Sequence, residues 1–285
     1  MSIEEYALSN GLHKVGARQP LFAYIKEAIQ RFDFAYTMAS LSNEAGNAKS
    51  RIGGWWNILL PTIQASMYGL VFGLILGRSR PDYFLPFLFT GVFLFSYVQG
   101  CFTNGASAIV ARQGLVRSLS FPRVLLPISM VISQTITLLP QLLVLLVILL
   151  ISQPLAAVSI SWLMIFPLIA LMFIFNIGLA TTMARITVHV QDLNKLIPFI
   201  SRLLFYVSGV FFAVEKILAS DSIYAQIIKA NPIYSFLSLA RGYLVYGYEV
   251  DPWMWVSVIA WSFGLAIFGV IFFWRAEERY GREDK

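Results

Sequence analysis

Charged residues are scarce in this sequence. Asp, Glu, Lys and Arg make up 13% of its 285 residues, while 58% are hydrophobic, and a soluble domain carries about 25% charged residues. This composition predicts an integral membrane protein, because a soluble domain could not bury so much apolar surface. The single cysteine, Cys101, excludes an intramolecular disulfide. The formal net charge of +6 does not indicate nucleic-acid binding, because the basic residues flank apolar segments.

Six apolar segments are long enough to cross a bilayer, which takes about 20 residues in helical form. They are residues 55–76, 84–105, 124–151, 162–184, 197–214 and 253–274. Backbone groups in lipid must find hydrogen-bond partners within their own segment, so we expect six transmembrane helices and an all-α fold. The chain then divides into a tail at 1–54, a membrane domain at 55–274 and a second tail at 275–285.

The distribution of Lys and Arg indicates the orientation of these helices. The two tails and the connections 106–123 and 185–195 contain fifteen basic residues, and the connections on the opposite side contain five. Because basic residues collect on the cytoplasmic side, we expect a multi-pass protein of the cytoplasmic membrane with both termini in the cytoplasm.

Two segments outside the predicted spans are also partly apolar. Phe22, Ile25, Ile29, Phe32 and Tyr36 recur at helical spacing, which predicts an amphipathic helix that lies in the membrane interface or packs on a partner protein. Residues 215–252 are apolar but too interrupted to span. They predict a short extracellular helical hairpin, re-entrant or lying on the surface, between the fifth and sixth spans, with its turn at Asn231-Pro232.

The sequence lacks the residues of an energy-coupling or catalytic site. The six segments contain no Asp, Glu, Lys or His, and Arg202 is their only charge, whereas a secondary transporter normally carries ionisable groups there. The phosphate-binding loop G-x-x-x-x-G-K-[ST] is absent. His189, Asp192 and Ser201 do not form a hydrolase triad, since no nucleophile elbow is present. We therefore expect no catalytic residue, metal site or cofactor on this chain, and a partner must supply the energy for uphill transport.

Four stretches carry a family resemblance: SRIGGWWNILLP at 50–61, SAIVARQGLVRSLSFPRVLLP at 107–127, VHVQDLNKLIPFISRLLFYVSGVFF at 188–212 and ANPIYSFLSLARGYL at 230–244. Their order resembles the permease subunits of ABC-2 type transporters, especially bacterial exporters of O-antigen, teichoic acid and related envelope polysaccharides. The match runs over about 50–275. Gln191 stands where the family has a basic residue, and Ile52 where it has Leu.

The resemblance implies a function and a set of partners. The chain would be the membrane-spanning subunit of an ABC exporter in a bacterial inner membrane, and its cargo a lipid-linked polysaccharide. A second copy of the chain and two copies of a separate ATPase subunit, which binds ATP and Mg, would complete the complex in membrane lipid. The alternative is an ABC-2 exporter of a drug, haem or another small amphipathic compound. No nucleic acid is expected as a partner.

The resemblance also assigns the 106–123 connection to ATPase coupling. In the family, a short cytoplasmic helix that ends in a Phe-Pro-Arg-like sequence contacts the ATPase. Here we expect a helix over 106–120 that Pro122 ends, with Arg112 and Arg117 pairing with acidic residues of the partner. The alternative is an anchor that only follows the positive-inside bias. The predicted coupling residues are Arg112, Gln113, Val116, Arg117, Phe121, Pro122 and Arg123.

Polar and aromatic side chains share stripes on three of the predicted spans. Polar groups are costly toward lipid, so these stripes should face protein or a cavity. Aromatic faces beside hydrogen-bonding groups suit a sugar ring, although the stripes could equally be helix–helix interfaces. The predicted cargo-path residues are Gln64, Tyr68, Thr90, Phe93, Tyr97, Asn104, Ser201, Arg202, Phe205 and Phe212.

Overall fold

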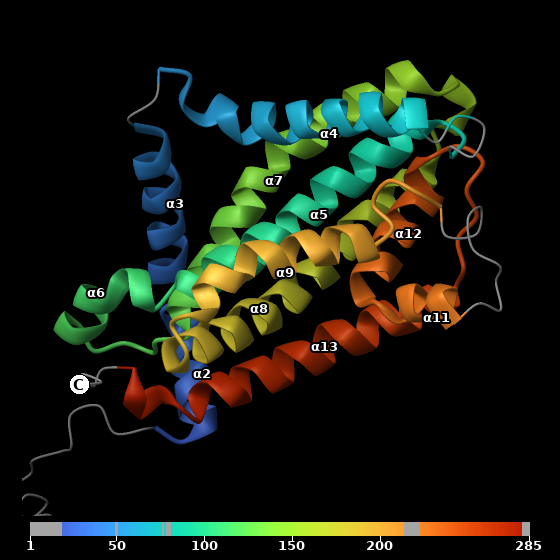
Figure 1. Ribbon diagram of the computed structural model, residues 1–285. Coiled ribbons are helices and arrows are strands. Elements are labelled where there is room, and N and C mark those ends of the chain that lie inside the picture. Colours follow the sequence, from blue (N-terminus) through green and yellow to red (C-terminus); the bar gives the residue numbers. More distant parts are fainter. Residues whose placement is uncertain (1–18, 49–50, 76, 78–80, 214–222, 281–285) are drawn as a thin grey trace, which may run out of the picture.

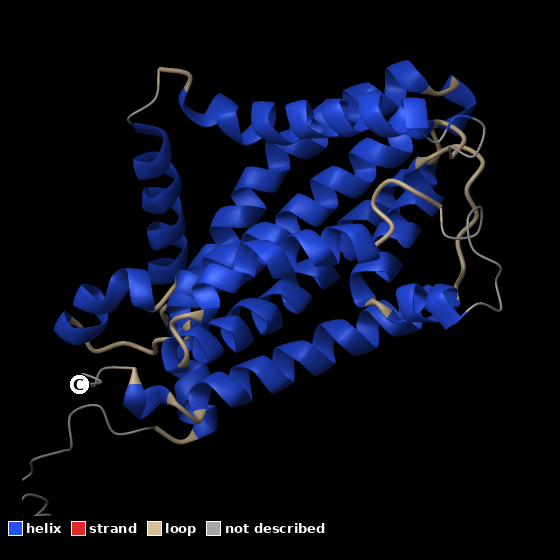
Figure 2. Cartoon of the chain, viewed as in Figure 1, coloured by secondary structure: helices blue, strands red, loops and turns tan. Residues whose placement is uncertain are grey.

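The computed structural model describes residues 19–48, 51–75, 77, 81–213 and 223–280, and over this part of the chain all regular structure is helical (Figures 1 and 2). The prediction of an all-α fold is confirmed. Five of the helices have the length and hydropathy to cross a membrane. They are α4 (Trp56–Ile75, preceded by the 3-10 turn Gly53–Trp55), α5 (Phe84–Ser107), α7 (Leu125–Ser152), α8 (Ile165–His189, preceded by the 3-10 turn Ile160–Met164) and α13 (Trp253–Trp274).

The helix α5 forms the centre of the bundle. In its most apolar 18-residue window, 78% of the residues are buried, compared with 6% for α4. α7 and α8 pack along α5, while α4, α9 and α12 cover its remaining sides. This position fits the composition of α5, which has the lowest mean hydropathy of the five helices, because a helix enclosed by other helices can turn polar side chains toward protein instead of lipid.

The fifth predicted span, 197–214, corresponds to a shorter helix, α9 (Leu193–Val207). At 1.5 Å per residue its 15 residues extend about 22 Å, less than the roughly 30 Å of a hydrocarbon core. The helix ends because Ser208 leaves the helical conformation and Gly209 adopts a left-handed φ of 63°. The count of six spans is therefore not confirmed within the described residues.

The segment before α13 folds into the helices α11 (Ile223–Ala230) and α12 (Pro232–Leu244). The predicted turn lies between them: the Asn231 side chain accepts a hydrogen bond from the amide of Ile233 (3.0 Å), and Pro232 is the first residue of α12. Most of α12 is buried against α5, α8 and α13. Residues 215–222 of the predicted hairpin segment, and residue 214 of the predicted fifth span, lie outside the described residues.

The N-terminal tail contains α2 (Leu21–Gln30) and α3 (Phe32–Ala48). Tyr24, Ala28, Ala35 and Ala39 face the protein and are buried. The predicted apolar face is instead exposed, and comprises Phe22, Ile25, Ile29, Phe32 and Tyr36. The chain's own packing thus leaves this face uncovered, as expected for a helix that contacts a membrane or another protein.

The predicted helix over 106–120 is wrong in its extent. α5 continues to Ser107, and the connection then forms a 3-10 turn (Val110–Arg112) and the short helix α6 (Gln113–Ser118). The break lies at Arg112, whose φ of −125° and ψ of 30° leave the helical region. The physical reason is the anchoring of Arg112 to α3 and α7, which turns the backbone at this residue.

Candidate functional site

The predicted coupling segment lies where α2, the start of α7 and the C-terminal 3-10 turn Glu277–Arg279 meet. Val116, on the inner face of α6, is buried in a hydrophobic cluster with Tyr24, Val124 and Tyr280. Three segments far apart in the sequence thus hold α6 and the following turn in place (Figure 1).

Arg112 points into the protein. Its guanidinium donates to the hydroxyl of Ser42 on α3 (3.2 Å) and to the sulfur of Met130 on α7 (3.5 Å). This partial burial lowers the pKa of the guanidinium. Arg112 therefore connects the segment to α3 and α7, whereas the sequence analysis placed it toward an acidic partner.

A buried carboxylate, which the sequence analysis missed, organises the other end of the segment. Glu277 accepts hydrogen bonds from the hydroxyl of Tyr24 (2.8 Å) and from the amide of Arg123 (3.0 Å). The Tyr24 hydroxyl also accepts from the amide of Val124 (3.0 Å), and the Arg123 guanidinium donates to the Glu277 carbonyl. In the sequence, Glu277 is recognisable only as an acidic residue shortly after the last predicted span.

Burial dominates the electrostatics of this network. Removing Glu277 from water raises the pKa of its carboxyl group, although the hydrogen bonds from Arg123 and Tyr24 and the charge of Arg123 act in the opposite direction. Burial and the nearby Glu277 also raise the pKa of the Tyr24 hydroxyl. The structure therefore favours a neutral Tyr24 whose hydroxyl donates a hydrogen bond to Glu277.

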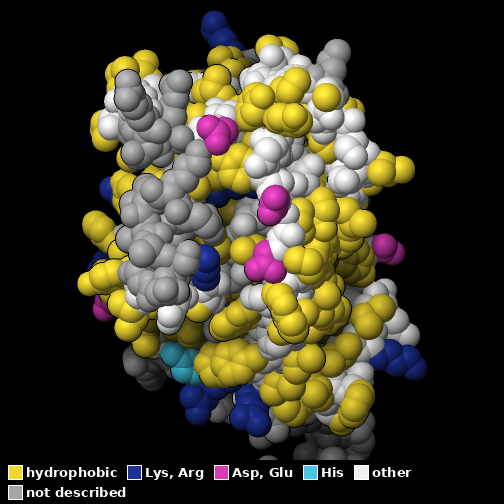
Figure 3. Space-filling view, turned by 90° about the vertical axis from the view of Figure 1, so that its right-hand side faces the viewer, with side chains coloured by type: hydrophobic (Ala, Val, Ile, Leu, Met, Phe, Trp, Pro, Cys, Tyr) yellow, Lys and Arg dark blue, Asp and Glu magenta, His cyan; other side chains and the backbone are white. Residues whose placement is uncertain are grey.

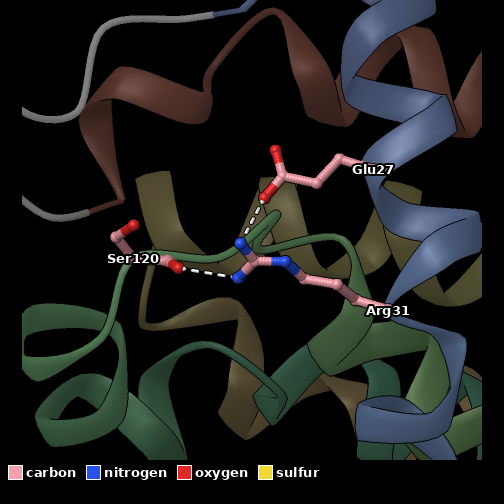
Figure 4. Close-up of polar contacts among 3 residues, drawn as sticks. All are labelled: Glu27, Arg31 and Ser120. Atoms are coloured by element: carbon pink, nitrogen blue, oxygen red, sulfur yellow. Dashed lines mark hydrogen bonds and ion pairs between the residues drawn. The ribbon is translucent and has the colours of Figure 1, made fainter.

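A third contact ties α2 to the turn after α6 (Figure 4). Arg31 forms an ion pair with Glu27 (2.9 Å) and donates to the Ser120 carbonyl (3.0 Å). Between α2 and this turn lies a cavity of about 300 Å³, with Glu27, Arg117 and Glu277 among its lining residues. The surface beside the segment is thus concave and carries charges of both signs.

The seven predicted coupling residues divide by position. Gln113 and Arg117 are exposed on α6. Phe121 is partly buried against Phe34 of α3 (ring centroids 5.0 Å apart), and Pro122 is buried. Together with Val116, Arg112 and Arg123, these two anchor the segment, so Gln113 and Arg117 are the members of the set that a partner can reach.

The structure brings only some of the predicted cargo-path residues together. The rings of Tyr68 on α4 and Phe205 on α9 lie 5.2 Å apart. Phe211 and Phe72, which the sequence analysis missed, extend this cluster: Phe211 lies 5.1 Å from Phe205 and stacks on Phe72 at 4.3 Å. Helices α4 and α9 and the turn after α9 therefore share an aromatic contact.

Phe212 adjoins this cluster, since its ring lies 6.2 Å from that of Phe211, and the other predicted path residues lie in different environments. Thr90, Phe93, Tyr97 and Ser201 are buried within the single chain, as is Phe205. Gln64 and Arg202 are exposed, and Asn104 and Phe212 are partly buried. The hydroxyls of Thr90 and Ser201 have no hydrogen-bond partner among the described residues.

Arg241 is a further buried charge, on α12, with 3% of its surface exposed. Its guanidinium donates to the carbonyls of Phe87 (3.2 Å), Gly209 (2.9 Å) and Val210 (2.6 Å), and it lies 3.5 Å from the centre of the Phe87 ring. It therefore joins α12 to α5 and to the turn after α9, at the opposite end of the bundle from α6. Its sequence signal was a single arginine in a largely apolar stretch.

No group of three or more His, Cys, Asp or Glu side chains in the described ranges could hold a metal ion. The groups that the structure does assemble are an anchored helical element at one end of a bundle of apolar helices, and a buried arginine at the other. This arrangement defines a multi-span helical membrane protein with a fixed contact surface beside its first helices.

The sequence comparisons give the family. Residues 45–245 match the model of the ABC-2 type transporter family, and the chain belongs to this family. Its relatives include an O-antigen export system permease protein RfbA of Klebsiella pneumoniae, 26% identical over 244 residues that cover 83% of this chain and 91% of the relative. An RfbA of Myxococcus xanthus is 24% identical over 219 residues (75% and 81%), and the polysialic acid transport protein KpsM of Escherichia coli is 24% identical over 229 residues (77% and 86%).

Proposed function

We propose that this chain is the membrane-spanning permease subunit of an ABC exporter that moves a lipid-linked cell-envelope polysaccharide out across a bacterial inner membrane. The observation that carries the proposal is the similarity, over most of both chains, to relatives named as O-antigen export permeases and a polysialic acid transport protein. The ABC-2 family model covers the same region. The cargo class thus rests on relatives whose names agree on polysaccharides.

A separate ATPase subunit drives the export in this proposal. The chain has no phosphate-binding loop, so ATP and Mg bind to the partner. Two copies of the ATPase contact two copies of this chain at the surface formed by α6, the following turn and α2. Gln113 and Arg117 are exposed there, and an acidic partner surface would complement Arg117.

The end of the bundle that carries α2, α6 and the turn Glu277–Arg279 is the cytoplasmic end in this proposal. Of the described Lys and Arg residues outside the long helices, most lie at this end, and the opposite end carries Lys229 on α11 and the buried Arg241. Figure 3 looks toward the opposite end, where hydrophobic side chains cover much of the surface and a few acidic side chains are exposed; some Lys and Arg side chains are also in view. In this orientation α11 and α12 form the re-entrant hairpin on the outer side.

The orientation can be tested with single cysteines in a Cys101→Ser background. Ser118 and Asp251 are exposed at opposite ends of the bundle. In intact cells, a membrane-impermeant maleimide should label Asp251→Cys and should label Ser118→Cys only after lysis. Labelling of both positions in intact cells would refute this topology.

The exposed apolar face of α2 and α3 rests in the inner leaflet of the membrane in this proposal. Phe22 and Ile29 are 87% and 69% exposed, and the exposed Lys26 lies between them on the same face, where its long side chain can reach the lipid headgroups. A helix with this division of side chains is stable at the boundary between headgroups and acyl chains. It would hold the coupling surface close to the membrane.

The experiment that tests the proposed function is deletion of the gene in its native host. The deletion should remove one polysaccharide from the cell surface while its lipid-linked form accumulates inside, and a plasmid copy should reverse both effects. An unchanged surface polysaccharide, together with increased sensitivity to a small amphipathic compound, would instead indicate a small-molecule exporter.

A further inference from the structure

An open cavity with several polar side chains in its wall lies between apolar helices of the bundle, apart from the aromatic cluster of α4 and α9. It has a volume of about 200 Å³ and lies between α4, α5 and α7. Its polar lining consists of Asn57, Ser96, Tyr97, Gln134, Thr137 and Gln141. We propose that this cavity is a subsite for one neutral sugar unit of the cargo, an inference that rests on the proposed function.

The depth of the cavity makes its polarity unusual. Gln134 and Gln141 lie about 14 Å and 24 Å along α7 from Leu125, at 1.5 Å per residue. If α7 crosses the membrane, both amides are within the hydrocarbon thickness of roughly 30 Å. Amide groups there must face protein or a hydrated space, because exposure to lipid leaves them without hydrogen-bond partners.

Internal hydrogen bonds fix part of the cavity wall. The Gln141 side chain donates to the Asn57 carbonyl (2.8 Å) and accepts from the Ser96 hydroxyl (3.2 Å). The Tyr97 hydroxyl shares a hydrogen bond with the hydroxyl of Thr135 (2.8 Å). These bonds connect the start of α4 to α5 and α7 and hold the Tyr97 ring in place. Gln141 and Tyr97 are therefore the polar lining residues that mainly stabilise the packing of these helices.

Gln134 has no such role. In the part of the chain that the structure describes, its amide forms no hydrogen bond. It lies against Gly100 of α5, where a Cβ atom would meet the Gln134 Oε1 at 2.0 Å. Gly100 thus leaves room for an amide that lines the cavity. A side-chain amide has a donor and an acceptor, which matches the hydroxyl groups of a sugar, since these also donate and accept.

The lining selects the chemical class of the ligand. No Lys, Arg, His, Asp or Glu lines the cavity, so a phosphate or a free ion would be buried without a counter-charge. The indole of Trp56 and the ring of Tyr97 add apolar faces beside the amides and hydroxyls. The volume is below the roughly 300–1,000 Å³ of ordinary ligand pockets, which fits a single sugar unit and not a longer stretch of polymer.

The test uses the complex of this chain with its ATPase subunit in lipid nanodiscs, prepared without glycoside detergents. Saturation-transfer NMR is recorded with methyl glycosides of glucose, mannose, galactose and rhamnose, and with methyl phosphate as the charged probe. At least one glycoside should bind and methyl phosphate should not. Gln134→Leu should weaken glycoside binding roughly fivefold, the equivalent of one lost neutral hydrogen bond.

Gln99→Leu is the matched control, because Gln99 lines a different cavity with residues of α8 and α9; it should bind like the wild type. Three results would overturn the subsite. The wild type and Gln134→Leu could bind the glycosides equally, no glycoside could bind at all, or methyl phosphate could bind and lose its binding in Gln134→Leu. Glycan export by the wild-type complex tests the proposed function separately. Normal export with equal binding by Gln134→Leu refutes only the subsite, and absent export refutes the proposed function.

Discussion

The hydroxyl of Tyr24 donates a hydrogen bond of 2.8 Å to Glu277, a residue 253 positions further along the chain. The same hydroxyl accepts from the amide of Val124 at the start of α7. One side chain of α2 therefore holds together the C-terminal turn and the end of the predicted coupling segment.

Tyr24→Phe should loosen this junction. The substitution keeps the ring but leaves the Val124 amide and one oxygen of Glu277 without partners, at a cost of about 1–3 kcal/mol. Hydrogen–deuterium exchange in peptides covering 19–30 and 275–280 should accelerate about tenfold or more. Tyr36→Phe is the control, since Tyr36 is 55% exposed. Equal exchange in wild type and Tyr24→Phe would show that the junction does not depend on the hydroxyl.

The Glu277 junction should also depend on pH. Burial raises the pKa of Glu277 above the ordinary value of 4.5, so the folded state favours the protonated form. Its contribution to stability is full below pH 4.5 and is lost as the pH rises through the folded-state pKa. Glu277→Gln cannot ionise, so its Tm relative to the wild type should increase as the pH is raised from 4.5. A Tm difference that stays constant with pH would contradict this reasoning.

Gly91 should be indispensable for the placement of Arg241. A Cβ atom on Gly91 would lie 2.3 Å from Arg241 Nη2 and 2.9 Å from the Val210 carbonyl, so the guanidinium would have to leave its three carbonyl acceptors. Gly91→Ala should lower the stability of the protein by about 1–3 kcal/mol, as overpacking does in other cores. The control is Gly264→Ala on α13, where a Cβ meets open space. Thermal unfolding of the two variants distinguishes them, and equal Tm values would show that Arg241 can move without cost.

Local patterns in the sequence predicted much of the fold. The apolar runs located the helices, and Asn231-Pro232 located the turn before α12. Hydropathy did not show that α9 ends at Val207, because the residues after it are equally apolar and the end depends on the backbone of Gly209.

The sequence did not predict which residues the charged side chains contact in the fold. Arg112 reads as an exposed basic residue of a connection, and its contacts, Ser42 and Met130, lie 70 and 18 residues away. Glu277 likewise reads as the start of a polar tail until the fold brings Tyr24 and Arg123 to it. Such contacts depend on the packing of whole helices, and neither periodicity nor charge counts can predict that packing.

Arg117 should contribute to ATPase binding. It is exposed on α6, whereas Arg112 is held by α3 and α7. Arg117→Glu should weaken association with the ATPase subunit about tenfold, because it replaces attraction by repulsion at an exposed contact. Arg275→Glu, an exposed charge reversal at the same end of the bundle, is the control. The dissociation constant of the two purified subunits is the measurement, and an unchanged value for Arg117→Glu would remove α6 from the interface.

The central claim is that this chain moves a lipid-linked polysaccharide with energy from a separate ATPase, and transport in proteoliposomes tests it most directly. Vesicles containing both subunits and a labelled lipid-linked glycan from the native host should transfer the glycan to the opposite face only when ATP and Mg are added. Vesicles containing this chain alone should neither hydrolyse ATP nor transfer the glycan. Glycan transfer driven by an ion gradient without ATP, or hydrolysis of ATP by this chain alone, would contradict the account.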